Sequence, residues 1–144
     1  MGDYSIKAAF EVNTAPDEVR RWLDNLDGIG GWWSDGVSGS AAGVGDRFAV
    51  TFPDAPMPFE LEVVEASSDS IEWYVAENPP WWKGTTIGFG LAQNEAGMTS
   101  LLFTHRGFDA EDPIIPMITP AWVRFLDNLV AVAESGVADA AVKN

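Results

Sequence analysis

Alternation of apolar and polar residues, repeated along most of the chain, is the feature that most constrains its fold. In residues 4–12, Ile6, Ala8, Phe10 and Val12 share one side. This period of two is typical of a strand with one buried face. Five later segments repeat it, with these sets on the apolar side: Phe48, Val50 and Phe52; Phe59, Leu61 and Val63; Ile71, Trp73 and Val75; Thr85, Ile87, Phe89 and Leu91; Thr99, Leu101, Phe103 and His105. The chain is therefore expected to form a sheet.

Turn residues separate these segments, at 53–58, 67–70, 78–80 and 94–97. Strands joined by such short turns pair antiparallel, because a parallel pair needs a crossover of about a dozen residues or more. The glycine-rich segment 36–45 shows no strand period and is expected to be a turn region.

Two short helices are expected between the first strand and this segment. Thr14-Ala15-Pro16-Asp17 is a helix-start signal, since it combines a cap hydroxyl, a first-turn proline and an early carboxylate. Val19, Trp22, Leu23 and Leu26 follow at helical spacing. Glycines at 28, 30 and 31 then favour a broken helix or a turn before Trp33.

The last element is an amphipathic helix. Thr119-Pro120 predicts its start, and Gly136 its end. Its apolar stripe consists of Trp122, Phe125, Leu126, Leu129, Val130 and Ala133. We expect this stripe to cover the sheet, and we expect the tail from about residue 137 to be frayed.

Together these elements predict a single α+β domain over residues 1–144, in which a long C-terminal helix closes one face of a curved antiparallel sheet. The buried face is rich in large rings: Phe48, Phe52, Phe59, Trp73, Phe89 and Phe103 face Trp122 and Phe125. Rigid rings are hard to pack to the density of about 0.74 found in protein interiors. A residual cavity between sheet and helix is therefore expected.

Composition excludes several classes of function. The chain has no cysteine, so a disulfide framework, a thiolate zinc site and a cysteine nucleophile are all ruled out. Its net charge of −14 opposes nucleic acid and anionic lipid. No apolar run reaches the ~18 residues that a membrane span needs, and the first residues lack a signal-peptide pattern. We expect a cytoplasmic protein without membrane insertion, metal or cofactor.

Several motifs occur in an order that resembles one superfamily. They are Trp32-Trp33, Val44 to Phe48, Val64-Glu65, Ile71-Glu72-Trp73, Gly84-Thr85-Thr86, Thr99 to Phe108, Trp122 and Phe125-Leu126. From Ile6 to Gly136 the chain resembles the START-like superfamily, also called SRPBCC, with its helix-grip fold. Within it the chain is most similar to the branch named after the activator of heat-shock chaperone ATPase, which is often grouped with polyketide cyclases.

The resemblance implies an apolar cavity between sheet and C-terminal helix, which in relatives holds lipids, sterols, polyketides or other flat apolar molecules. Our leading hypothesis is therefore that the chain is a non-enzymatic or weakly enzymatic domain that binds such a ligand. The expected ligand-binding residues are Trp33, Phe48, Val50, Phe59, Leu61, Trp73, Thr85, Ile87, Phe103, His105, Trp122 and Phe125. A cyclase or aromatase and a chaperone-activating interaction module are the alternatives, and a homodimer stays open.

His105 is the only histidine and the one candidate catalytic group. It would serve the enzyme alternative as an acid or base. The competing interpretation is a buried histidine whose nitrogens are bonded within the scaffold. A metal site is not expected, because carboxylates alone would have to complete it.

Arg47 and Arg106 have the parity of the wet face, so we expect surface ion pairs with neighbours such as Glu62. Trp81-Trp82 follows two prolines on a loop. Two adjacent indoles are hard to bury together, so a lid or an interface is one interpretation of this pair. A loop folded back onto the core is the equal alternative.

Overall fold

The structure is a computed structural model that describes residues 2–144. One antiparallel sheet runs in the order β1-β7-β6-β5-β4-β3-β2. Its strands are β1 (Tyr4–Val12), β2 (Gly36–Gly39), β3 (Arg47–Thr51), β4 (Phe59–Ala66), β5 (Ser70–Tyr74), β6 (Thr86–Gln93) and β7 (Thr99–Phe108). The predicted meander is confirmed from β3 to β7. On its other side, β7 pairs antiparallel with the N-terminal strand β1, so that Ile6 lies opposite His105.

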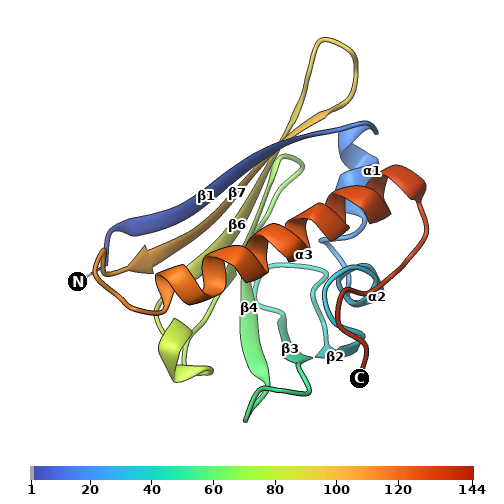
Figure 1. The fold of residues 1–144 in the computed structure, drawn as a ribbon. Helices are drawn as coiled ribbons and strands as arrows, with labels where there is room; N and C mark the ends of the chain where they lie inside the picture. The colour runs from blue at the N-terminus through green and yellow to red at the C-terminus, as the bar shows by residue number, and fades with distance from the viewer. Residues whose placement is uncertain (1) are drawn as a thin grey trace.

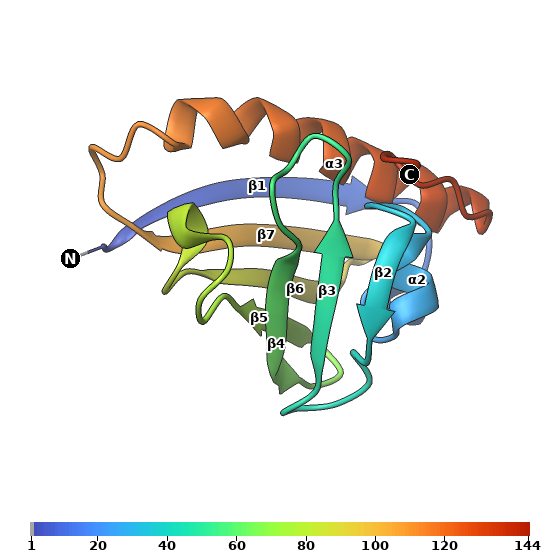
Figure 2. The ribbon, with the colours of Figure 1, turned by 90° about the horizontal axis from the view of Figure 1, so that it is seen from below.

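The helices are α1 (Pro16–Arg20), α2 (Leu26–Gly30), the 3₁₀ turn η1 (Pro80–Trp82) and α3 (Ile115–Ser135). Helix α3 crosses the inner face of the curved sheet, as Figures 1 and 2 show. Helices α1 and α2 lie near its C-terminal end, and η1 lies near its N-terminal half (Figure 1). The predicted α+β helix-grip class is confirmed. In the part of the chain described, no helix has the length and apolar character to cross a membrane.

The strand residues with inward parity form the interior together with α3. Alternation along the strands puts every second side chain under the helix. In β4, for example, Phe59, Leu61 and Val63 are buried, while Glu60 is exposed. Helix α3 buries Trp122, Leu126, Leu129, Val132 and Ala133. The apolar stripe predicted for this helix therefore faces the sheet.

Strand β2 was not expected, because its sequence Gly-Val-Ser-Gly carries no alternating pattern. It forms because it completes the ladder along β3, where Val37 lies opposite Val50. Gly39 has φ +103°, and a Cβ there would lie 2.4 Å from the carbonyl oxygen of Arg47. Glycine is thus required where the edge strand turns, and tertiary pairing supplies the strand that local sequence does not signal.

Helix α3 begins at Ile115, so the predicted start at Thr119-Pro120 is wrong. The first turn of α3 is preceded instead by Asp112, whose side chain accepts a hydrogen bond from the backbone N–H of Ile114 at 2.9 Å. Pro116 occupies the first turn, where no N–H is needed. Pro120 then lies inside the helix, where its missing N–H leaves the carbonyl of Pro116 without its bond from residue 120.

The tail after Gly136, expected to be frayed, runs beside the segment that follows α2. The N–H groups of Asp139, Ala141 and Val142 donate to the carbonyls of Gly31, Trp32 and Trp33 at 2.7, 3.0 and 2.9 Å. This backbone ladder holds the tail against the segment that carries the two central tryptophans.

Replacement of Pro120 by alanine should stabilise the protein. Pro120→Ala restores the N–H that bonds Pro116, and an interior proline costs a helix about 3 kcal/mol. Because the present helix has already adapted to the proline, we expect a gain of about 1–2 kcal/mol in the free energy of unfolding, measured by urea denaturation.

Pro116→Ala is the matched control. Its N–H would find no partner in the first turn, so stability should change by less than about 0.5 kcal/mol. Equal effects of the two substitutions would contradict this account of Pro120.

Candidate functional site

An apolar pocket of about 180 Å³ opens between η1, the N-terminal half of α3 and the ends of β3 and β4. It is lined by Phe52, Phe59, Trp81, Trp82, Ile118, Ala121, Trp122 and Phe125. Six of these eight residues are aromatic and none is ionisable. The lining of the pocket is therefore apolar and largely aromatic.

The walls of the pocket are rings in contact with one another. Trp82 of η1 stacks on Trp122 of α3 with centroids 5.9 Å apart and an interplanar angle of 17°. Phe59 meets the edge of Trp82 at 4.7 Å and that of Phe52 at 4.9 Å. Offset stacking and edge-to-face contact are the preferred aromatic geometries. Trp81 is 37% exposed at the rim, whereas Trp82 is 5% exposed.

Trp33 lies behind these walls. Its centroid is 5.4 Å from that of Trp122, 5.7 Å from that of Phe52 and 6.3 Å from that of Phe125. On its other side Trp33 stacks on Trp73 at 6.1 Å and 9°. Both indoles are fully buried. Around Trp33, aromatic rings occupy space beneath the helix where the sequence led us to expect a cavity. The apolar pocket lies at Phe52, Trp122 and Phe125, which separate it from Trp33.

A hydrogen-bond network joins the two walls of the pocket through the sheet. The indole Nε1–H of Trp122 donates to Nδ1 of His105 at 3.0 Å. Nε2 of His105 lies 2.9 Å from Oγ1 of Thr85. The hydroxyl of Thr85 donates to the carbonyl oxygen of Trp82 at 2.6 Å. We call these four residues the His105 network.

The directions of these bonds fix the protonation of His105. An indole N–H can only donate, so Nδ1 must accept and carries no proton. The proton of the neutral ring is therefore on Nε2 and is donated to Thr85, whose own hydrogen goes to Trp82. A protonated ring would present an Nδ1–H to the N–H of Trp122. Burial also disfavours the charged form and lowers the pKa of His105 to about 3.

The geometry thus gives both ring nitrogens of His105 partners within the scaffold. Its side chain is fully buried, and burial lowers its pKa to about 3. A general acid or base works best with a pKa near the operating pH. The lowered pKa of His105 does not favour that role.

Not every buried donor near the pocket is bonded. Within residues 2–144, the indole N–H groups of Trp33, Trp73 and Trp82 have no hydrogen-bond partner. Each of these indoles packs against a neighbouring ring. A buried donor left unpaired costs about 1–3 kcal/mol. Ring packing, rather than polar bonding, therefore holds this interior together.

The twelve residues predicted to bind ligand occupy three places. Phe59, Trp122 and Phe125 line the apolar pocket. Thr85 and His105 stand behind it in the His105 network. The other seven are buried: Trp33, Phe48, Val50, Leu61, Trp73, Ile87 and Phe103. Of these, Phe48 and Leu61 also border a second cavity.

Five residues that line the pocket were not among the twelve. Phe52 has the inward parity of its strand, and this signal was available in the sequence. Trp81 and Trp82 were considered as a lid, and both lie at the pocket. Ile118 and Ala121 sit in the first two turns of α3, on either side of the start predicted at Thr119-Pro120.

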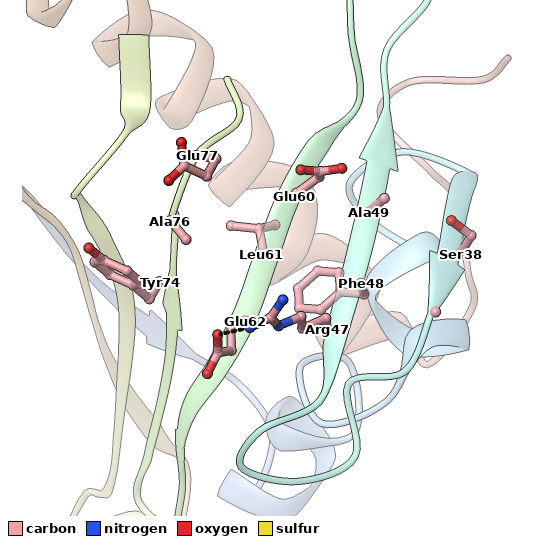
Figure 3. A pocket seen from close by; sticks show the side chains of 11 residues that line it. Ser38, Arg47, Phe48, Ala49, Glu60, Leu61, Glu62, Tyr74, Ala76 and Glu77 are labelled. Carbon is pink, nitrogen blue, oxygen red and sulfur yellow. Dashed lines mark ion pairs between the residues drawn. The ribbon is translucent and has the colours of Figure 1, made fainter. Parts of the chain in front are cut away.

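A second cavity, of about 360 Å³, lies on the outer side of β3 and β4 (Figure 3). Its charged side chains are already paired: Arg47 with Glu62 at 3.3 Å, Glu60 with Asn78 at 2.9 Å, and Glu77 with Lys83 at 3.3 Å. The ion pair expected between Arg47 and Glu62 is therefore confirmed. Exposed pairs of this kind mark a solvated surface.

The other arginine with outward parity is Arg106, which forms a two-pronged ion pair with Glu72 at 2.9 and 3.0 Å. Among residues 2–144, no group of three or more His, Asp or Glu side chains is arranged to hold a metal ion.

No family model matches the chain, and no curated protein matches it. Solved structures do match. The solution structure of the Aha1 dimer from Colwellia psychrerythraea has a TM-score of 0.81 and 26% identity, and the match covers 92% of this chain and 98% of that one. A protein from Mesorhizobium loti has a TM-score of 0.76 and 18% identity, with the same coverage. A protein from the dynemicin biosynthetic locus has a TM-score of 0.74 and 20% identity, over 94% of this chain and 49% of that one.

The neutral His105 predicts a loss of stability in weak acid. In the unfolded chain its pKa returns to about 6.5, so between pH 6.5 and 3 only the unfolded state takes up the proton. The histidine's contribution is complete above pH 6.5 and is lost as pH falls. From pH 6 to 5 the free energy of unfolding should drop by roughly 1.2 kcal/mol more in the wild type than in His105→Gln, measured by urea denaturation.

The imidazole ¹⁵N shifts give a check that does not depend on stability. They should show a neutral Nε2–H ring that does not titrate between pH 8 and 5. In Trp122→Phe the indole donor is gone, so the pKa of His105 should rise. A wild-type titration with its midpoint near pH 6.5 would contradict the network.

Proposed function

Because the chain has the helix-grip fold of the START-like superfamily, we propose that it binds a small apolar molecule in the pocket between η1 and α3. The observation that carries this proposal is the lining itself, which is aromatic on three sides and free of ionisable groups. Such a surface, left open to water, is the usual mark of a binding site.

The enzyme alternative finds no support in the geometry of its one candidate group. A cyclase would need His105 to exchange a proton beside a bound carbonyl, yet both ring nitrogens are engaged in the His105 network. The site therefore favours binding over catalysis.

One observation favours a second candidate, an interaction module for a heat-shock chaperone ATPase. The Aha1 structure is similar over nearly the whole chain. In addition, α3 exposes two apolar side chains, Met117 at 71% and Val123 at 48%. Exposed apolar side chains on a helix are available for contact with a protein partner.

Filling the pocket should abolish ligand binding. Ala121 lines the pocket between Trp122 and Ile118, so the ring of Ala121→Phe would occupy the volume of a guest. Toluene, naphthalene and dodecane serve as probes of different size, detected by shifts of the Trp82 and Trp122 indole N–H signals. At least one probe should move these signals in the wild type and bind tenfold or more weakly in the variant.

Ala131→Phe is the matched control, since Ala131 lies on the exposed side of the same helix and should leave binding unchanged. Silence of the indole signals with every probe would refute the proposed binding function.

The second candidate is tested with the purified chaperone. Addition of the protein should raise the rate of ATP hydrolysis, and Met117→Asp should weaken that effect, because it places a charge on the apolar contact. An unchanged rate at saturating protein would remove this candidate.

A further inference from the structure

We propose that the apolar pocket between η1 and α3 is selective for one neutral aromatic ring, the size of a substituted benzene, and excludes acyl chains, larger ring systems and anions. This inference rests on the proposed binding function and specifies its ligand class. It follows from four features of the pocket: its volume, its floor, its fixed walls and its chemistry.

The volume admits one ring. The pocket measures about 180 Å³. An engineered apolar cavity of about 150 Å³ holds benzene, whereas sites for drug-sized molecules measure about 300–1,000 Å³. The space is therefore sufficient for a benzene ring with a short substituent and too small to enclose a sterol or a polyketide.

The floor prevents a longer molecule from passing deeper. Trp33 closes the space behind Phe52, Trp122 and Phe125, with centroid distances of 5.4 to 6.3 Å. It is fully buried, and Trp73 stacks on its far side. An acyl chain could enter the interior only by displacing an indole held on both faces.

The walls are held in place as well. Trp82 and Trp122 approach each other from different elements, and the His105 network connects them through Thr85 and His105. Widening the pocket would stretch this chain of three buried hydrogen bonds. Each of these bonds would then leave an unpaired polar group in an apolar interior, which opposes expansion around a larger guest.

The chemistry of the lining selects a neutral ring. No ionisable group lines the pocket, and residues 113–123 carry no charged side chain. A carboxylate brought here would lose its hydration and find no cationic side chain among the lining residues; the guanidinium of Arg124 lies over the ring of Phe125, 5.0 Å from its centroid. The protein's net charge of −14 repels an anion as well. Aromatic guests gain over saturated ones, because six lining rings offer faces and edges to them.

The test compares the affinities of four probes for the full-length protein, again from the Trp82 and Trp122 indole N–H signals. Toluene is the reference, methylcyclohexane is its saturated counterpart, naphthalene adds a ring, and benzoate adds a charge. Toluene should bind at least fivefold more tightly than methylcyclohexane and at least tenfold more tightly than benzoate. Naphthalene should bind no more tightly than toluene, although it is the more hydrophobic molecule.

Two variants enlarge the pocket. Trp33→Phe lowers the floor, and Ile118→Ala widens the half-buried rim, where the fold should tolerate the change. Either variant should increase the affinity for naphthalene relative to toluene by fivefold or more. Wild-type preference for naphthalene, methylcyclohexane or benzoate over toluene would overturn the inference and leave the binding function intact. If none of the four probes, nor dodecane, moves the indole signals, the binding function fails as well.

Discussion

The packing of aromatic rings around Trp33 is the interaction on which the rest of this structure depends. Trp33 comes from the segment after α2, yet it contacts Phe52, which directly follows β3, and rings from β5 and α3. It therefore joins the part of the sheet around β3 and β5 to the closing helix. The C-terminal tail donates a hydrogen bond to the carbonyl of the same residue and holds its backbone in place. Removal of this one ring would leave a large cavity in contact with three elements, and for a buried tryptophan such a loss costs about 3–5 kcal/mol.

The same packing determines what the fold can be used for. A helix closing a curved sheet leaves space between the two layers, and the side chains decide how much of it stays open. Here tryptophan and phenylalanine occupy most of it, and an apolar pocket of about 180 Å³ opens at one end of the helix. Structures with TM-scores of 0.71 to 0.81 share the fold, but a shared fold does not transfer a ligand. The proposed selectivity for one small ring therefore rests on this chain's own side chains.

The His105 network shows how a polar group can serve an apolar site. A buried histidine between Trp122 and Thr85 is neutral, because its two nitrogens face one group that can only donate and one hydroxyl that passes its hydrogen onward. Three bonds connect helix α3 to η1 without placing a charge in the interior. Such a network is a positioning device, and it explains why the only histidine of an acidic protein lies in its core rather than on its surface.

Much of the fold could be predicted from the sequence, because local rules produce it. Alternation along Phe59, Leu61 and Val63 assigns a strand and its buried face, and the same parity correctly placed Arg47 and Arg106 on the outside. The apolar stripe of α3 follows from its helical period. Strand β2 and the first turn of α3 escaped prediction, because a glycine-rich edge strand has no pattern of its own and Asp112 starts the helix before the more obvious signal at Thr119-Pro120. The sequence alone thus determined the fold class, the burial of each strand face and the absence of thiol chemistry. Only the tertiary structure decided how far the rings fill the interior, where the pocket opens and that His105 is neutral. These properties depend on distances between side chains that are up to 92 residues apart, and no local pattern encodes such distances.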